Sequence, residues 1–359
     1  MSRVTGRNSS AQGSSSRVGI KDVARLAQVS PGTVSNVLNH PERVRAERRE
    51  AVERAIQQLG YVRHEAARHL RSGTSKTIGL LLLDAWNPGF LDVARGVEDA
   101  TARDGWTVLI SNSARDLERE KTYLRLFAER RVAGLIAVPH DQFGENLRRI
   151  RAGGIPVTVV DRAESGDDEM SVAVDDVTGG ALAAQHLLDL GHRHLAFVGD
   201  EAAAAPIHER LTGVRRAVDA MSNGSRPIRL DVIPAELTVD AGRVVGDRLA
   251  TAVDRPTGIV ASIDLLAFGI LQALLQHGLV VPDDVSLCGY DDIPFARQLS
   301  VPLTSVYRPH YEMGTTAAAM IVGALSGEPP EPRHALFTPK LVVRESTAPP
   351  PASGRRSTA

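Results

Sequence analysis

Residues 18–60 contain three short segments in which apolar residues recur at helical spacing. The first carries apolar residues on one helical face, at Ile20, Val23, Ala24 and Ala27. The second starts at Ser30-Pro31, because serine is a good N-cap and proline a good first helical residue, and it continues to Asn39. The third is predicted over roughly 46–59, where Gly60 ends it. Three short helices with a tight turn between the first two predict a helix-turn-helix unit.

From residue 77 onward, short apolar runs alternate with amphipathic helical patterns. The apolar runs are 77–83, 107–110, 134–138, 156–160, 172–174, 195–198, 258–261 and 285–287. The helical patterns are 90–103, 118–130, 178–190, 207–221, 240–252 and 265–277. This alternation predicts parallel sheets with helices on both faces. The segment is too long for one sheet, so we expect an α/β core of two lobes.

Charge is distributed unevenly between these two regions. The chain has 359 residues with 42 Lys and Arg against 43 Asp and Glu, so its net charge is close to zero. Residues 1–76 nevertheless contain 14 basic and 6 acidic residues, whereas residues 77–359 contain 28 and 37. A basic head on an acidic body indicates a polyanionic partner for the head.

Cysteine usage and the chain ends indicate the compartment. The single cysteine, Cys288, lies in an apolar run and excludes an intramolecular disulfide, so we expect a buried thiol. The polar segment 1–17 has no apolar core of a signal peptide, and no apolar run is long enough for a membrane span. We therefore expect a soluble, cytoplasmic protein with a disordered arm at 1–17 and a disordered tail at 348–359.

Enzyme signatures are missing from the sequence. It has no Walker A loop, no Gly-x-Gly-x-x-Gly after the first strand and no Gly-x-Ser-x-Gly elbow. His64 and His69 are five residues apart, whereas two helical zinc ligands need a spacing of about four. We therefore predict no catalytic residue, no metal site and no cofactor.

One motif is highly specific: VGIKDVARLAQVSPGTVSNVLN, from Val18 to Asn39. Further motifs follow in order: AIQQLGY (55–61), AARHLRSG (66–73), TIGL (77–80), NPGF (87–90), RVAGLI (131–136), HLLDLGHR (186–193), VPDDVS (281–286), GYDDIP (289–294), PLTSV (302–306) and LVVREST (341–347). Together they closely resemble the LacI/GalR family of bacterial transcription regulators, over roughly residues 18–347.

The resemblance implies an all-α helix-turn-helix head and an α/β two-lobed core like that of periplasmic binding proteins. The implied domains are a head at 18–62, a hinge helix and linker at 63–76, and a core at 77–347. Within the core, the lobes cover approximately 77–162 and 163–305, while chain crossings share 306–347 between them. The implied function is that of a repressor that binds a palindromic double-stranded DNA operator as a homodimer, without a membrane. The resemblance also implies that a small-molecule effector, a sugar or related metabolite, binds in the cleft between the lobes.

The resemblance also implies which residues contact DNA. The implied set is Ser30, Pro31, Gly32, Thr33, Ser35, Asn36, Asn39, Ala67 and Leu70. Most relatives have Arg where this chain has Asn36, and asparagine suits adenine whereas arginine suits guanine. Asn36 therefore either reads a base edge or contacts only a phosphate. Leu70 matches a hinge leucine that wedges into the minor groove, although it could instead pack on its own helix.

For the effector, the resemblance implies Phe90, Asp161, Arg210 and Asp291. The charged residues among them could instead be ordinary strand-end or surface charges. At several positions where relatives have polar or aromatic residues, this chain has Gly89, Ala204, Ala205, Pro206, Leu237 and Ile263. We therefore expect an effector with fewer hydroxyl groups than a free hexose, or one that binds weakly.

Two other classes of protein compete with a regulator. A solute-binding protein without a regulatory role would share the core, but the basic head and the absence of a signal peptide disfavour it. A nucleotide-dependent α/β enzyme would share the alternation of strands and helices, but the absence of glycine fingerprints disfavours it.

Overall fold

The computed structural model describes residues 18–61, 75–140, 144–162, 169–200, 202, 204–222, 227–328 and 330–351. The chain divides into two compact units, Met1–Thr74 and Ser75–Ala359, which we call the head and the core and describe separately. Among the described residues, no helix combines the length and the apolar character needed to cross a bilayer.

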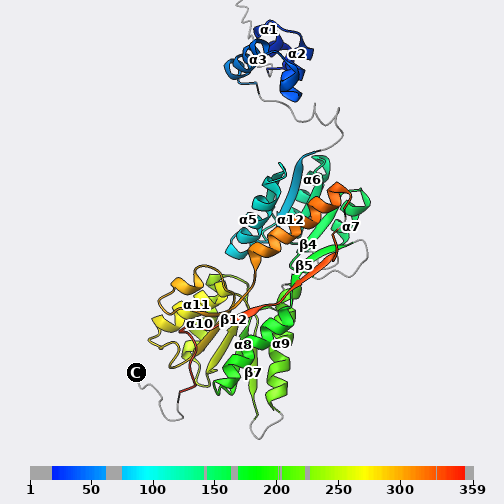
Figure 1. Cartoon of the computed structure of the whole chain (residues 1–359). Coiled ribbons are helices and arrows are strands. Elements are labelled where there is room, and N and C mark those ends of the chain that lie inside the picture. Colours follow the sequence, from blue (N-terminus) through cyan, green and yellow to red (C-terminus); the bar gives the residue numbers. More distant parts are fainter. Residues whose placement is uncertain are drawn as a thin grey trace, which may run out of the picture. The chain divides into compact units, whose positions relative to one another are not determined.

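The head consists of short helices (Figure 1). They pack around a small aliphatic centre. Its elements are α1 (Ile20–Leu26), α2 (Pro31–Asn39), the 3-10 turn η1 (Pro41–Arg43) and α3 (Ala46–Leu59). The buried side chains are Val23, Ala24, Val34, Val37, Val52 and Ala55. Gly60 ends α3 with a φ of 58°, a left-handed conformation that glycine adopts without strain. All three predicted helices are confirmed.

The core contains two six-stranded sheets. The first has the order β11-β5-β4-β3-β1-β2 and the second the order β12-β10-β9-β8-β6-β7. The strands of the first sheet are β1 (Thr77–Leu82), β2 (Thr107–Asn112), β3 (Gly134–Ala137), β4 (Val157–Val160), β5 (Met170–Val174) and β11 (His334–Phe337). Those of the second are β6 (His194–Val198), β7 (Arg229–Ile233), β8 (Gly258–Ala261), β9 (Ser286–Asp291), β10 (Thr304–Tyr307) and β12 (Lys340–Val342). All neighbours pair in parallel except β10 and β12, which are antiparallel.

Helices pack on both sheets, so each sheet and its helices form one lobe (Figure 1). The core helices are α5 (Pro88–Ala102), α6 (Leu117–Glu129), α7 (Glu145–Ala152), α8 (Asp176–Asp189), α9 (Ala205–Ser222), α10 (Val239–Thr251), α11 (Asp264–Gln276) and α12 (His310–Ser326), with the 3-10 turn η2 at Ala296–Gln298. Close helix pairs need small residues at their contacts. A Cβ on Gly96 of α5 would lie 2.2 Å from the backbone oxygen of Tyr311 in α12.

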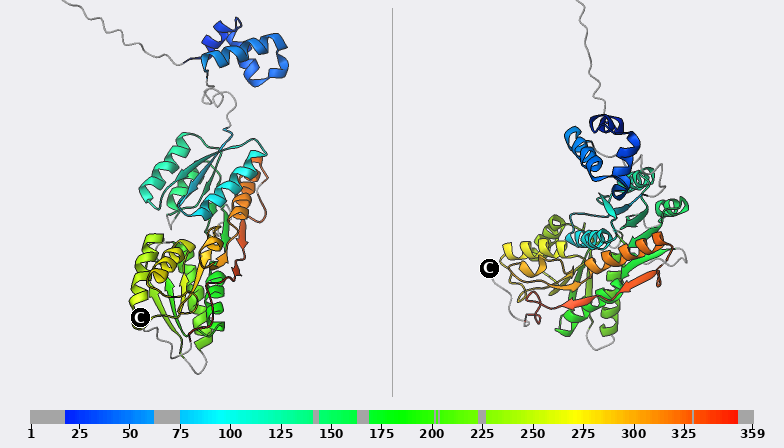
Figure 2. Two further views of the ribbon diagram at one scale, coloured as in Figure 1. Left: turned by 90° about the vertical axis from the view of Figure 1, so that its left-hand side faces the viewer. Right: turned by 45° about the horizontal axis from the view of Figure 1, so that its top comes forward.

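The chain passes between the lobes more than once. It leaves the first sheet after β5, enters α8 in the second lobe, and returns from β10 to α12, which packs on the first sheet. It crosses again between β11 and β12, and Figure 2 shows this C-terminal part, orange to red, in both lobes. The first crossing therefore follows Val174, later than the expected lobe boundary at residue 162.

Several elements were missing from the sequence prediction. They are β7, β10, β11, β12, α7 and α12. β7, β11 and β12 are partly exposed strands at the edges of their sheets, so their residues do not form apolar runs. The sheets are also not wholly parallel, because β12 returns alongside β10 in the opposite direction.

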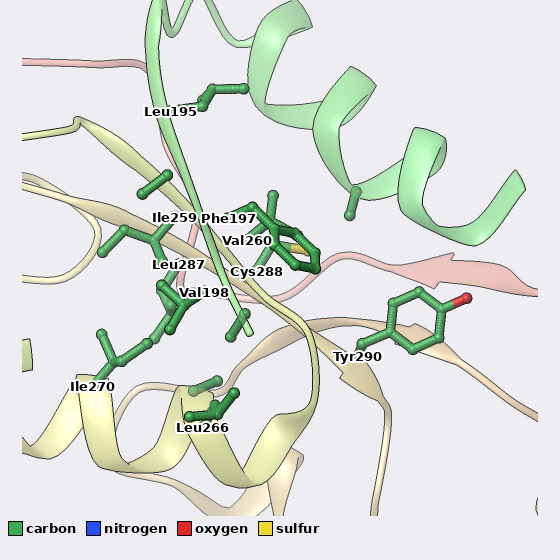
Figure 3. Close-up of a cluster of buried hydrophobic side chains, with 14 of the residues drawn as sticks. Leu195, Phe197, Val198, Ile259, Val260, Leu266, Ile270, Leu287, Cys288 and Tyr290 are labelled. Carbon is green, nitrogen blue, oxygen red and sulfur yellow. The ribbon is translucent and has the colours of Figure 1, made fainter. Parts of the chain in front are cut away.

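Aliphatic side chains from β6, β8, β9 and α11 form the centre of the second lobe (Figure 3). Cys288 is fully buried among them, as predicted, and burial raises the pKa of its thiol. Tyr290 lies at the margin of this cluster, and its hydroxyl group points away from it (Figure 3). β9 therefore runs from an apolar interior toward a polar site at its carboxyl end.

Candidate functional site: a recognition helix and an interlobe cleft

The start of α2 is fixed by local hydrogen bonds. Ser30 is the N-cap, and its hydroxyl oxygen accepts a hydrogen bond from the backbone N–H of Thr33 at 3.1 Å. The hydroxyl groups of Ser30 and Thr33 lie 3.0 Å apart. Pro31 is the first helical residue, so both sequence predictions for this helix start are confirmed.

One face of α2 packs inward and the other faces solvent. Val34 and Val37 are buried in the head, whereas Pro31, Gly32, Asn36 and Asn39 are exposed. The side-chain nitrogen of Asn39 donates to the backbone oxygen of Ser35 at 2.8 Å. The predicted base-contacting positions thus lie on the open side of the helix, where a groove of DNA has room to approach. Ala67 and Leu70, the predicted DNA contacts of the hinge, lie outside the described residues.

In the core, all of the predicted effector residues line one cavity. This cavity measures about 30 Å³ and is bordered by Phe90, Asp161, Arg210 and Asp291. Phe90 comes from α5 of the first lobe, and Arg210 from α9 of the second. Arg210 is therefore a helix residue, within the helical pattern predicted over 207–221.

The two predicted carboxylates occupy strand ends of different lobes. Asp161 directly follows β4, and Asp291 is the last residue of β9. Their φ angles are 68° and 104°, a region that non-glycine residues rarely adopt. Such strained positions cluster at ligand-binding sites, where the surrounding structure holds them in place. Asp291 also accepts a hydrogen bond across the cleft from the side-chain nitrogen of Asn87, at 3.2 Å.

Two buried arginines connect these carboxylates. Nε of Arg210 donates to Oδ1 of Asp176 at 2.9 Å, and its Nη1 donates to the backbone oxygen of Ser262 at 2.6 Å. Its Nη2 lies 3.7 Å from Oδ1 of Asp291, so the charged groups of Arg210 and Asp291 face each other. The guanidinium group of Arg210 also stacks over the ring of Tyr290, at 3.8 Å from the ring centre.

The second arginine, Arg308, follows β10 at the crossing between the lobes. It forms an ion pair with Asp161, and its nitrogens lie 3.7 Å from Oδ2 of Asp176 and 3.5 Å from Oδ1 of Asp291. Its Nη1 also lies 3.5 Å from Nε2 of His310. Arg308 is thus within ion-pair distance of carboxylates from three segments of the core.

Burial and charge shift the pKa values in this cluster. Burial raises the pKa of Asp161, although the nearby Arg308 opposes this effect. Burial alone would also raise the pKa of Asp176, but Arg210 and Arg308 outweigh it and lower that pKa. Burial and the two guanidinium groups hold the pKa of His310 well below its usual range, so this imidazole is neutral.

Sequence reasoning missed Asn87, Asp176, Arg308 and His310 at this site. Arg308 directly follows β10 as Asp161 directly follows β4, but β10 (TSVY) is not an apolar run, so no strand end was predicted there. Asp176 begins a helix, where an acidic residue normally suits the helix dipole, so nothing in the sequence distinguished it. Within the described residues, no group of three or more His, Cys, Asp or Glu side chains is arranged to hold a metal ion.

Several positions where relatives have polar or aromatic residues, and this chain does not, border the same cavity. Ala204, Pro206, Leu237 and Ile263 all line the cavity. Gly89 makes room for His310, because a Cβ on Gly89 would lie 2.6 Å from Nε2 of that imidazole. The cavity wall on this side is apolar, and its polar groups are concentrated in the ion-pair cluster.

A helix-turn-helix head joined to a two-lobed α/β core with a cleft defines a class of ligand-responsive transcription regulators. Residues 19–64 match the lacI family of bacterial regulatory proteins, and residues 184–347 match the periplasmic binding protein-like domain. The repressor PurR of Vibrio parahaemolyticus is 33% identical over 91% of this chain and 98% of its own. The repressor PurR of Aliivibrio fischeri (strain ATCC 700601 / ES114) is 33% identical over 92% of this chain and 98% of its own.

Solved structures agree. The lac repressor dimer bound to operator and the anti-inducer ONPF is 25% identical, with a TM-score of 0.76 over 93% of this chain and 100% of that one. The regulator CelR, in its complex with cellobiose, is 29% identical, with a TM-score of 0.68 over 92% of this chain and 100% of that one. The chain belongs to the LacI family of bacterial regulatory proteins, and it is a DNA-binding transcriptional repressor.

Proposed function

We propose that this repressor binds a near-palindromic operator as a homodimer and that a small molecule in the interlobe cleft changes its affinity for that operator. One head presents one short helix and reads only a half-site, so two heads related by two-fold symmetry require a two-fold symmetric DNA sequence. The lac repressor structure, in which a dimer binds operator, supports this arrangement by similarity.

In this proposal the exposed side of α2 enters the major groove. Pro31 and Gly32 have no side-chain hydrogen-bonding groups, so Asn36 carries most of the direct reading of bases and favours adenine. Ser30, Thr33, Ser35 and Asn39 contact phosphates or adjacent bases, and Ala67 and Leu70 contact the minor groove. The basic composition of residues 1–76 supplies the attraction to phosphates that does not depend on sequence.

The observation that best supports effector control is the shared cavity of Phe90, Asp161, Arg210 and Asp291. These residues come from both lobes, so a ligand that contacts all of them favours one arrangement of the lobes over others. Such a difference in affinity between two arrangements is what allows a ligand to shift an equilibrium. Relatives of known structure bind ribose and cellobiose, and the apolar wall here suits a ligand with fewer hydroxyl groups.

We further infer that the protein has no enzymatic activity and acts in the cytoplasm. Among the described residues of the cleft, Arg210 and Arg308 and the carboxylates beside them are held in ion pairs, an arrangement that suits binding rather than catalysis. A transcription regulator also has to reach DNA, which in bacteria lies in the cytoplasm.

Selection of DNA from a random pool by the full chain tests the proposal. We expect an enriched near-palindrome with two half-sites, and footprinting should show protection of both. An enriched site without two-fold symmetry would contradict dimeric operator binding. Selection with Asn36→Ala should lose preference at one symmetric pair of positions, and an unchanged profile would assign Asn36 to the DNA backbone.

A further inference from the structure

The centre of the interlobe cleft is filled by a side chain of the protein itself. Arg308 is 3% exposed and lies within ion-pair distance of Asp161, Asp176 and Asp291. The cavity that remains beside it, at about 30 Å³, has room for about two water molecules and is far smaller than typical ligand pockets. A small molecule of the size of a sugar cannot share this space with Arg308.

Without Arg308, the site has the charge of a cation-binding site. The three carboxylates would face only one buried cation, Arg210, which is already engaged with Asp176 and the backbone oxygen of Ser262. Oδ1 of Asp291 is buried and accepts no hydrogen bond within the described part of the chain. The nearest guanidinium nitrogens lie 3.5 and 3.7 Å from this oxygen, too far for a good hydrogen bond. Uncompensated buried carboxylates are costly, so this arrangement requires a cation.

The carboxylates around Arg308 belong to both lobes. Asp161 directly follows a strand of the first sheet, whereas Asp176 begins α8 of the second lobe and Asp291 ends a strand of the second sheet. A cation among them therefore holds the lobes together. Arg308 also borders a second hollow of about 370 Å³, whose lining includes the carboxylates of Asp92 and Glu312 as well as Arg95 and Arg344, so a displaced side chain has room beside the cleft.

We propose that the centre of the cleft is a cation site for a guanidinium, amidinium or primary ammonium group, and that Arg308 is its internal occupant. In the absence of a ligand, Arg308 links the lobes. An effector with its own cationic group replaces Arg308 at the carboxylates and displaces it from the cleft. This inference rests on the proposed effector role of the cleft and specifies which chemistry enters it.

Chemical rescue tests the proposal on the full chain. Dyes on Ala128→Cys of α6 and Val253→Cys after α10 report the distance between the lobes, because both positions are exposed while native Cys288 is buried. Labelled chains are diluted into excess unlabelled chains, so that signals between protomers are suppressed. We expect a single narrow distance distribution for the parent chain without ligand, and a longer or broader one for Arg308→Ala.

Guanidinium chloride at about 20 mM, far below the molar concentrations that unfold proteins, should restore the narrow distribution of Arg308→Ala. Urea at the same concentration is the neutral control of similar shape and should not restore it. Arg297→Ala, which removes an exposed arginine of the same region, should behave as the parent chain. An unchanged distance in Arg308→Ala, no response to guanidinium, or equal rescue by urea would each overturn the proposal.

A second variant covers the case in which Arg308→Ala does not fold. Arg308→Gln combined with Asp161→Asn removes both charges of the closest pair, so it leaves less uncompensated charge. We expect separated lobes that do not respond to guanidinium, and lobes held as in the parent chain would contradict the proposal. These measurements use neither DNA nor an effector, so their failure would leave the proposed operator binding and effector control untouched.

Discussion

The head and the cleft arrange their functional side chains in opposite ways. On α2 the polar side chains are exposed or half-buried, and the hydrogen bond from Asn39 to Ser35 spans only four residues along the chain. In the cleft, Arg210 and Arg308 are buried and bind partners 34 and 147 residues away. Substitutions in the head should therefore change DNA binding with little effect on folding. Those in the cleft should change stability and ligand response together.

The largest expected effect is the loss of core stability in Arg210→Ala. This change leaves buried Asp176 and the backbone oxygen of Ser262 without their donor, and breaking a buried ion pair typically costs about 3–5 kcal/mol. Urea denaturation of the full chain, followed by a probe in the core, measures it. Arg297→Ala is the matched control and should stay within about 0.5 kcal/mol of the parent chain. Equal stability of both variants would mean that the buried pair contributes nothing.

The next effect is on recognition of DNA. Asn36→Ala should weaken operator binding by about 1–3 kcal/mol, because one base contact is lost. It should leave binding to random DNA and the free energy of unfolding nearly unchanged, because Asn36 is exposed. Fluorescence anisotropy with operator DNA and with scrambled DNA measures specific and non-specific binding separately. If Asn36→Ala weakens binding to both DNAs equally, Asn36 contacts the phosphate backbone.

A smaller effect is expected at the cap of α2. Ser30→Ala removes the acceptor for the N–H of Thr33 and should reduce the stability of the head by about 1 kcal/mol. Ser30→Asp retains an acceptor and should preserve stability. Hydrogen exchange of the α2 amides, measured in the full chain, reports this change in local stability. Identical exchange in Ser30→Ala and the parent chain would exclude the cap as a source of stability.

The core should also lose stability gradually as pH falls. Burial lowers the pKa of His192, whose ring lies 2.9 Å from the oxygens of Thr257 and Ala348. The unfolded chain then binds a proton at a higher pH than the folded core, so stability falls once pH drops below the ordinary histidine pKa of about 6.5. Thermal unfolding at pH 7.5 and pH 5.5 measures this, and His192→Gln should reduce the dependence. If the stability of His192→Gln depends on pH as strongly as that of the parent chain, groups other than His192 cause the dependence.

The sequence predicts the functional side chains of the head better than those of the cleft. Ser30 and Pro31 identify the start of α2 because capping acts within a few residues, so the sequence contains the whole cause. Asp161 and Asp291 were found through family resemblance, and both indeed end strands. Arg308 was missed because its role depends on the crossing that brings it to Asp161, 147 residues earlier. β12 was missed for a related reason, since its antiparallel pairing with β10 depends on where the chain returns.

The most direct test of the account is operator affinity with and without a ligand in three chains. A ligand is first found by its effect on the thermal unfolding of the parent chain, with guanidinium and primary amines among the compounds screened. Affinity for the selected operator is then measured for the parent chain, Asn36→Ala and Asp291→Asn.

The account predicts that the ligand changes operator affinity of the parent chain at least about tenfold, which corresponds to a coupling of about 1.4 kcal/mol. Asp291→Asn should keep the ligand-free affinity and lose the response to the ligand. Asn36→Ala should lose operator affinity but still bind the ligand. A normal response in Asp291→Asn, or loss of ligand binding in Asn36→Ala, would contradict the division between a head that reads DNA and a cleft that controls it.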